Sequence, residues 1–250
     1  MAKRDVLYES ADHKVYVFTG MSPEESIETN QFLLIHKDSA MLIDPGGHTI
    51  FSILFAEISS LISLANLKYI FFSHQDPDIV GGMNGWLLST DAKLIIPKLW
   101  TRFIGHIGLK KGFEKRLIAI DDKGASIPLS DIEIKIIPAH FMHSPGNLQI
   151  YDPFSKILFS GDVGASVKNN YMFVEDFEAH KRYIEGFHKR YMANNKICRL
   201  WADMVSKLDI EIIAPQHGAF FKGKEVVNSF INWIRELECG TDIMDEVFNQ

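Results

Sequence analysis

The chain contains 250 residues, of which 46% are hydrophobic and 23% charged, and its formal net charge is −6 at pH 7. This length and composition are typical of a soluble protein with one large domain, and no apolar run reaches the roughly 18 residues that a membrane span requires. The negative charge argues against a nucleic-acid-binding surface, and we expect a cytoplasmic protein because no apolar signal stretch follows the first basic residues.

The N-terminal part of the chain predicts a meander of short strands. These strands are expected at 13–20, 30–36 and 40–47, where two glycines end the last one. Apolar residues at helical spacing then predict a helix over 52–66 with Ser52 as its N-cap. The apolar run over 67–73 predicts a return to strand.

Strand and helix patterns continue to alternate in the rest of the chain. We expect a short helix at 81–89, strands at 92–97, 130–140 and 156–162, and a helix or covering loop at 98–111. The C-terminal part predicts helices from 175 to 208, a last strand at 210–218 and a closing amphipathic helix at 225–238. Since no linker or repeat interrupts this pattern, we expect a single domain over residues 1–250.

Residue types that bind metals follow four of the predicted strands. These residues are His74, Asp76, Asp78, His143, Asp162 and His217. A lone aspartate at a strand end is usually a turn or cap residue, and a lone histidine is usually a hydrogen-bonded structural residue. If the strands share one sheet architecture, however, their ends converge on one edge. Six such residues at matched positions therefore favour a metal cluster.

The motif "HQDPDI" at 74–79, followed by His143, Asp162 and His217, resembles the metallo-β-lactamase superfamily, whose fold is an αββα sandwich in the mixed α/β class. The superfamily hallmark is HxHxDH followed by a distant His, Asp and His, and "AMLIDPGG" resembles the aspartate–glycine strand end that precedes it. The resemblance covers nearly the whole chain. The carboxylate of Asp76 at the third motif position resembles the flavodiiron branch, which has HxExDH, rather than the hydrolases.

Two departures narrow the resemblance. This chain has no FMN-binding phosphate loop or flavodoxin module, and the sixth motif position is Ile79 instead of histidine. Both features resemble the stand-alone oxygen-binding diiron proteins of bacterial signalling and chemotaxis, in which "HQDPD" and a segment like "EGFHKRYMANNKICRLW" recur. The resemblance thus implies a diiron domain without a flavodoxin domain and without FMN.

The family pattern also implies a role for each candidate ligand. Metal 1 would take His74, Asp76 and His143, metal 2 would take Asp78 and His217, and Asp162 would bridge the two. Imidazoles and carboxylates without a thiolate suit two iron ions, with zinc or manganese as substitutes. The missing histidine leaves metal 2 with open positions for dioxygen or NO, unless water, His140 or His48 completes it.

Other residues have two interpretations each. Ile79 could form an apolar wall that slows proton delivery to the site, or it could be a core residue. Tyr191 could donate a hydrogen bond to a bound oxygen species, or it could be a half-buried structural tyrosine. Trp100, Phe103 and His106 could roof the pocket or pack in the core. We expect Cys198 and Cys239 to be reduced and partly buried, and we expect the remaining histidines named here to be exposed or structural: His13, His36, His180 and His188.

The leading functional hypothesis is a cytoplasmic oxygen or redox sensor that acts on a signalling partner. A second hypothesis is an O2 or NO reductase that receives electrons from a separate donor protein. If the chain is an enzyme, we therefore expect a diiron oxidoreductase rather than a β-lactamase. A two-metal zinc hydrolase is a third reading, which Asp76 and the missing sixth ligand disfavour, and a metal-free binding module is a fourth. A homodimer through 228–237 is an alternative to core packing of that apolar stripe.

Overall fold

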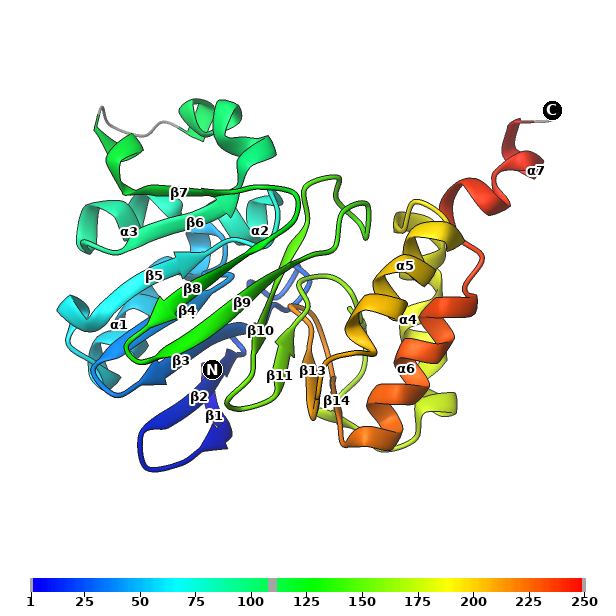
Figure 1. Cartoon of the computed structure of the whole chain (residues 1–250), viewed down its shortest axis with the longest axis horizontal. Helices are drawn as coiled ribbons and strands as arrows, with labels where there is room; N and C mark the ends of the chain where they lie inside the picture. The colour runs from blue at the N-terminus through cyan, green and yellow to red at the C-terminus, as the bar shows by residue number, and fades with distance from the viewer. Residues whose placement is uncertain (1, 108–111, 249–250) are drawn as a thin grey trace.

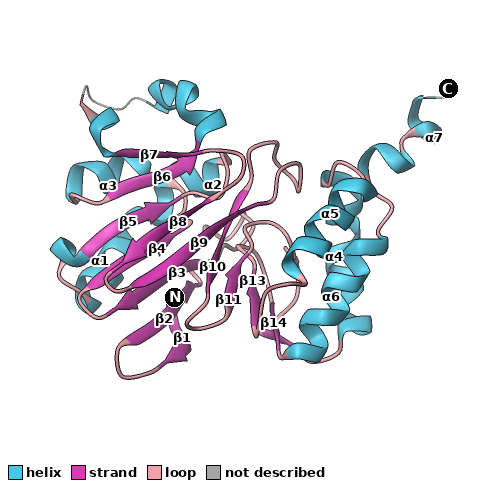
Figure 2. Cartoon of the chain, viewed as in Figure 1, coloured by secondary structure: helices cyan, strands magenta, loops and turns pink. Residues whose placement is uncertain are grey.

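A computed structural model describes residues 2–107 and 112–248 of the chain. Two sheets pack face to face, with helices on both outer faces (Figures 1 and 2). The first half of the chain builds one sheet and the second half builds the other. The αββα sandwich implied by the sequence resemblance is therefore confirmed.

The first sheet changes from antiparallel to parallel pairing at its centre. Pairing is antiparallel from β1 to β4 and parallel from β4 to β7. Its strands lie side by side in chain order: β1 (Lys3–Glu9), β2 (His13–Thr19), β3 (Gln31–His36), β4 (Ser39–Ile43), β5 (Leu67–Phe71), β6 (Lys93–Pro97) and β7 (Leu117–Ile120).

The second sheet is mostly antiparallel, with parallel pairs between β11 and β13 and between β12 and β14. Its strands lie in the order β12 (Phe173–Val174), β14 (Phe220–Lys222), β13 (Ile212–Ala214), β11 (Ile157–Phe159), β10 (Leu148–Asp152), β9 (Ile132–Pro138) and β8 (Ala125–Leu129).

The helices divide between the two outer faces (Figure 1). The first sheet carries α1 (Phe51–Leu61), α2 (Pro77–Val80) and α3 (Met83–Ser89), together with the 3-10 turns η1 (His48–Ile50), η2 (Leu64–Asn66), η3 (Lys98–Ile107) and η4 (Phe113–Arg116). The second sheet carries α4 (Phe177–Tyr191), α5 (Asn195–Val205) and α6 (Lys224–Glu236), followed by η5 (Gly240–Ile243) and α7 (Asp245–Phe248). Among the described residues, no helix is long and apolar enough to cross a bilayer.

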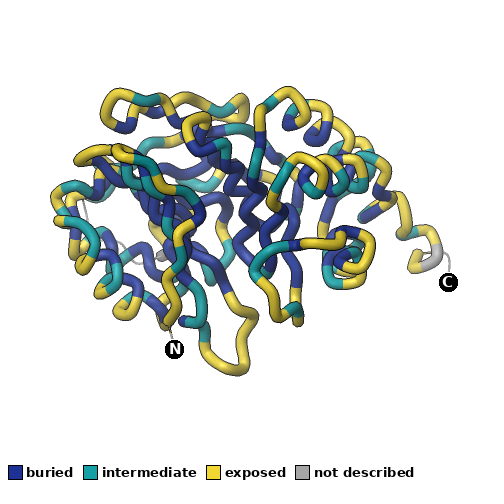
Figure 3. Tube along the Cα trace, turned by 90° about the horizontal axis from the view of Figure 1, so that it is seen from below, coloured by how far each residue is buried: buried dark blue, intermediate teal, exposed yellow. Residues whose placement is uncertain are grey.

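Three apolar clusters hold these layers together. One lies between the sheets, one between the first sheet and its helices, and one between the second sheet and α4, α5 and α6. The strands are accordingly the most buried part of the trace in Figure 3. The apolar stripe of α6 belongs to the third cluster through Val227, Phe230, Ile231 and Ile234, so it packs in the core of this chain.

Several element boundaries differ from the sequence predictions. The predicted N-cap at Ser52 is wrong, because η1 runs directly into α1 and leaves Ile50 at the N-cap without a side-chain hydrogen bond. The helix ends at Leu61, since Ile62 is extended, and not at residue 66. The strand at 210–218 is not the last one, because the three-residue β14 follows it. Predicted residues 98–111 form η3 as far as Ile107, and 108–111 lie outside the described residues.

Candidate metal centre

The first three candidate ligands lie between the end of β5 and the first turn of α2. Pro77 takes the first helical position of α2, where its missing N–H costs no hydrogen bond. Asp76 lies before the helix in an extended conformation, and its carbonyl accepts the N–H groups of Ile79 and Val80. This turn separates Asp76, before the helix, from Asp78 in its first turn, so the two carboxylates serve different halves of the centre.

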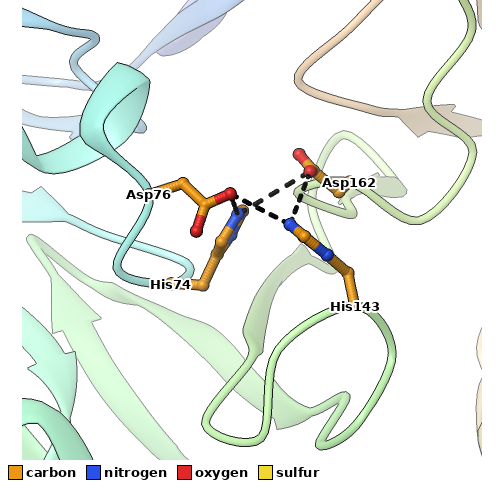
Figure 4. Close-up of side chains that lie close together, drawn as sticks. All are labelled: His74, Asp76, His143 and Asp162. Atoms are coloured by element: carbon orange, nitrogen blue, oxygen red, sulfur yellow. Dashed lines mark hydrogen bonds and ion pairs between the residues drawn. The ribbon is translucent and has the colours of Figure 1, made fainter. Parts of the chain in front are cut away.

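Four side chains from three distant segments converge in the first half of the centre (Figure 4). His143 Nε2 lies 3.0 Å from Asp76 Oδ2 and 3.3 Å from Asp162 Oδ2. His74 Nε2 lies 3.6 Å from the same Asp76 oxygen and 3.7 Å from the same Asp162 oxygen. One ligand atom from each of the four residues lies within 4.8 Å of the others.

The second half uses the other oxygen of Asp162. His217 Nε2 lies 3.5 Å from Asp162 Oδ1 and 3.3 Å from Asp78 Oδ2. Asp162 thus presents Oδ2 to His74 and His143 and presents Oδ1 to His217. The structure brings all six sequence-predicted residues together in a two-part arrangement with Asp162 between the parts.

Unsatisfied polar atoms show that the centre fits a cation. His74 Nε2 and Asp162 Oδ1 are buried and have no hydrogen-bond partner within the described part of the chain. Such atoms are costly in a folded protein unless something binds them. Three imidazoles and three carboxylates that converge without a thiolate form a donor set suited to iron, manganese or zinc.

Hydrogen bonds to the far ring nitrogens orient two of the three histidines of the centre, His74 and His217. Ser73 Oγ lies 3.0 Å from His74 Nδ1, and the Ser73 N–H donates to Asp44 Oδ1 at 2.8 Å. His217 Nδ1 donates to the carbonyl of Glu28 at 2.9 Å. These contacts direct Nε2 of both rings into the centre, as supporting residues of metal sites commonly do. Sequence reasoning assigned no such role to Asp44 or Glu28, although the motif "AMLIDPGG" contains Asp44.

The charges of the centre are coupled. Burial acts to lower the pKa of His217, but Asp78 and Asp162 outweigh it and raise that pKa to about 9. The hydrogen bond from His143, together with the nearby His74 ring, holds the pKa of Asp76 well below its ordinary value. Burial raises the pKa of Asp44 to about 6, against the hydrogen bond from Ser73. Without a cation, the neighbouring carboxylates favour the protonated form of His217, so metal binding at this ring must displace a proton.

A pocket of about 180 Å³ opens over the centre. Asp76, Asp78, His143, Asp162 and His217 line its floor, and its walls are Ile27, Ala165, Val167, Phe187 and Tyr191. The Tyr191 ring meets the His143 ring edge to face at a centroid distance of 5.2 Å, and Tyr191 is 53% exposed. Sequence reasoning identified Tyr191 but missed Phe187, which packs against both rings.

Other predicted pocket residues lie elsewhere. Ile79 is fully buried in the apolar cluster beneath the first sheet and is absent from the described lining of the pocket. His140 Nε2 donates to the carbonyl of Asp122 at 2.7 Å, and His48 is exposed. Trp100 and Phe103 line a separate apolar pocket of about 310 Å³ behind His74, and His106 is exposed.

The four remaining histidines named from the sequence are all buried: His13, His36, His180 and His188. His188 Nε2 accepts the N–H of Gly164 at 2.9 Å and its Nδ1 donates to the carbonyl of Ile184, so it supports the loop that follows Asp162. His180 Nδ1 contacts the Tyr171 hydroxyl at 2.8 Å. All four are structural within this fold.

The αββα sandwich with a two-part His/Asp centre at one end of its sheets defines a protein of the metallo-β-lactamase fold with a flavodiiron-type core. A family model described as "ODP family beta lactamase" matches residues 27–218. The chain belongs to this ODP family.

Individual relatives agree with this assignment. A structure of the apo state of the chemotaxis sensor ODP from T. denticola is 47% identical, with a TM-score of 0.89 over 99% of both chains. A structure of the peroxy diiron species of chemotaxis sensor ODP is also 47% identical, with a TM-score of 0.88 over 98% of this chain and 100% of that one. An uncharacterized protein of Methanocaldococcus jannaschii is 27% identical over 89% of this chain, which spans 57% of that relative's length. The rubredoxin oxygen:oxidoreductase of Desulfovibrio gigas, 13% identical with a TM-score of 0.79 over 94% of this chain and 61% of that one, shares the fold.

Proposed function

We propose that this chain binds dioxygen at a two-iron centre and reports oxygen to a signalling partner. The observation that carries the proposal is the division of Asp162 between two groups of ligands, one with His74 and His143 and the other with His217. The 47% identity to a chemotaxis sensor whose diiron state has been observed as a peroxy species supports the choice of iron and dioxygen. A cytoplasmic location belongs to the same proposal, since the chain's two cysteines are free thiols.

Each ligand has a defined task in this proposal. His74, Asp76 and His143 would hold the first metal, Asp78 and His217 would hold the second, and Asp162 would contact both. Two iron ions would supply the electrons that dioxygen binding requires. The second metal would have fewer protein ligands than the first, and the residues that would hold it, Asp78, Asp162 and His217, line the small pocket.

The pocket walls control access to the centre. Ile27, Val167 and Phe187 present apolar surface, which limits the water that can reach the ligands. Tyr191 holds the only hydroxyl group among the described lining residues, and it stands against the ring of His143. We assign Tyr191 the task of donating a hydrogen bond to the ligand in the pocket.

The proposal is tested by loading the protein with Fe(II) without oxygen and then admitting air. The wild-type chain should bind about two iron ions and develop a visible absorption band. The variant Asp162→Asn should lose both properties, whereas His106→Ala, at an exposed histidine, should keep them. Tyr191→Phe should bind iron normally but lose the band faster. A wild-type chain that binds no iron, or that stays colourless in air when loaded, would contradict the proposal.

An O2 or NO reductase is the second candidate function, because the open pocket would also admit a turnover substrate. It differs from the sensor in its need for an external electron donor. Continuous gas consumption with reduced rubredoxin or a flavoprotein would favour the reductase, and a single stoichiometric uptake would favour the sensor.

A further inference from the structure

The two cysteines of the sequence meet in the helical layer on the second sheet. Cys198 lies in α5, and Cys239 lies 41 positions later, between α6 and η5. Their sulfur atoms are 3.6 Å apart, and both residues are fully buried. The sequence predicted two reduced, partly buried thiols, and the fold buries both fully and places them in direct contact.

The surroundings give the two sulfurs different chemistry. The Asp242 N–H donates to the Cys239 sulfur, and Asp242 Oδ2 in turn accepts the Cys239 N–H at 3.1 Å. A hydrogen bond from Cys198 lowers the pKa of Cys239, and the same contact together with burial raises the pKa of Cys198. Because the Asp242 N–H can stabilise a thiolate at Cys239, Cys239 is the more nucleophilic sulfur and Cys198 is placed to react second.

We propose that Cys198 and Cys239 are an oxidation site that forms a reversible disulfide, with hydrogen peroxide as the oxidant. The Cys239 thiolate attacks one peroxide oxygen, which breaks the O–O bond, forms a sulfenic acid and releases hydroxide that takes up a proton. The Cys198 sulfur then attacks the Cys239 sulfur, loses its proton and displaces the second oxygen as water. In sum, two thiols and one peroxide give one disulfide and two waters.

The required movement is small. The sulfur–sulfur distance must shorten from 3.6 Å to about 2.05 Å. The Cys239 side of the pair belongs to the C-terminal segment, which runs along the outer edge of the helical layer (red in Figure 1). A displacement of this segment, rather than of the packed helix α5, both admits peroxide and closes the bond.

The segment that would move is connected to the metal centre. The Thr241 N–H donates to the carbonyl of Ala193 at 2.9 Å, and the Ala193 N–H donates to the carbonyl of Phe141 at 3.1 Å. Phe141 begins the loop that carries His143, and both residues have positive φ angles, 64° and 73°. Thr241, two residues after Cys239, is therefore joined by two backbone hydrogen bonds to the strained loop that carries His143.

The test uses the full chain without iron, so that its outcome is independent of the proposed diiron function. After treatment with a modest excess of hydrogen peroxide, alkylation of the unfolded protein should show both thiols lost together. The intact mass should fall by roughly 2 Da, and digestion should give a cross-linked peptide pair containing Cys198 and Cys239 that dithiothreitol separates. Because the disulfide forms within one chain, the oxidised protein should run at the mass of a single chain on a non-reducing gel.

Single variants are the matched controls. In Cys198→Ser, Cys239 should stop at the sulfenic acid and react with dimedone. In Cys239→Ser, oxidation of Cys198 should be at least about tenfold slower than oxidation of Cys239 in the other variant. Two free thiols after peroxide treatment of the wild-type chain, or thiol loss without the cross-linked pair, would overturn the proposal.

Discussion

Asp162 is the residue on which the two halves of the centre depend. Its Oδ2 faces two imidazoles, its Oδ1 faces a third, and Oδ1 is buried without a hydrogen-bond partner among the described residues. The two halves are otherwise unequal, because the first has three further candidate ligands and the second has two. The weaker half should therefore respond first to the loss of a side chain.

Replacement of His217 by alanine tests this inequality. The second metal would keep only Asp78 and Asp162, so the iron content of a loaded sample should fall from about two ions per chain to about one. Elemental analysis after removal of free iron measures the content, with His106→Ala as the control. Retention of two ions, or loss of both from a folded variant, would contradict the ligand division described above.

At the scale of single residues, the sequence predicts the ligands better than the residues that support them. Histidines and aspartates at the ends of apolar runs follow a pattern that is visible along the chain, and all six meet in space. The contacts of Ser73 with Asp44 and of His217 with Glu28 join segments that only the tertiary fold brings together. Phe187 was missed for the same reason, because its helical spacing is equally typical of a core residue.

At the scale of elements, strongly patterned segments were predicted and short or unusually polar ones were missed. The apolar strand β5 was predicted, whereas β10 contains buried Gln149 and Asp152, which break any alternation of polar and apolar residues. These polar side chains are buried because the fold supplies partners for them. The missed strands are β1, β7, β8, β10, β12 and β14.

The buried amide of Gln149 links helix α5 to the segment that precedes Asp162. Trp201 Nε1 in α5 donates to Gln149 Oε1 at 2.9 Å, and Gln149 Nε2 donates to the carbonyl of Ser160 at 2.8 Å. Trp201→Phe would leave the Gln149 oxygen unsatisfied, so we expect a loss of about 2 kcal/mol in the free energy of unfolding. Urea denaturation of the metal-free protein measures it. Leu200→Ala, next to it but 58% exposed, should change little, and an equal effect of both variants would contradict this role.

Helix α4 contributes a buried neutral histidine whose effect depends on pH. Burial lowers the pKa of His188 from 6.5 to about 4, so the unfolded chain binds a proton that the folded chain does not. The contribution of His188 to the free energy of unfolding is therefore undiminished above pH 6.5. It decreases as the pH falls, and the loss reaches about 3 kcal/mol at pH 4.

The variant His188→Gln keeps a hydrogen-bonding side chain but has no proton to gain. Urea denaturation at a series of pH values, with a chelator present in all samples, should show a smaller loss of stability for His188→Gln than for the wild-type chain between pH 6.5 and 4. Equal slopes would mean that His188 is accessible to protons in the folded state.

At the scale of the whole molecule, polar contacts join the two sheets at both ends of their strands. At the metal end, the Asn30 N–H before β3 donates to Gln216, and the Leu148 N–H of β10 donates to Ser73. At the opposite end, β3 ends at His36 and β10 ends at Asp152. His13 of β2 contacts both residues and so lies between them. The sandwich is thus held by a polar cluster far from its metal centre.

This distant cluster is a continuous chain of hydrogen bonds. His13 Nε2 contacts Asp152 Oδ2 at 2.8 Å, the Nδ1 atoms of His13 and His36 are 3.1 Å apart, and His36 Nε2 contacts Asp131 Oδ1 at 2.8 Å. Each of the two imidazole rings takes part in two of these three contacts. Removal of one ring therefore breaks two contacts at once.

The variant His13→Phe keeps the ring shape and the stacking on Phe154, whose centroid lies 4.7 Å away, but removes both hydrogen bonds. Asp152 and His36 would then lose a partner in a buried position, so we expect the free energy of unfolding to fall by about 3 kcal/mol. Urea denaturation measures this loss, and Lys14→Ala, which removes an ion pair with Glu9 at the surface, should leave stability nearly unchanged. Because the cluster and the metal centre lie at opposite strand ends, the folded variant should still bind as much iron as the wild-type chain, and a parallel loss of iron would show that the two ends are coupled through the sheets.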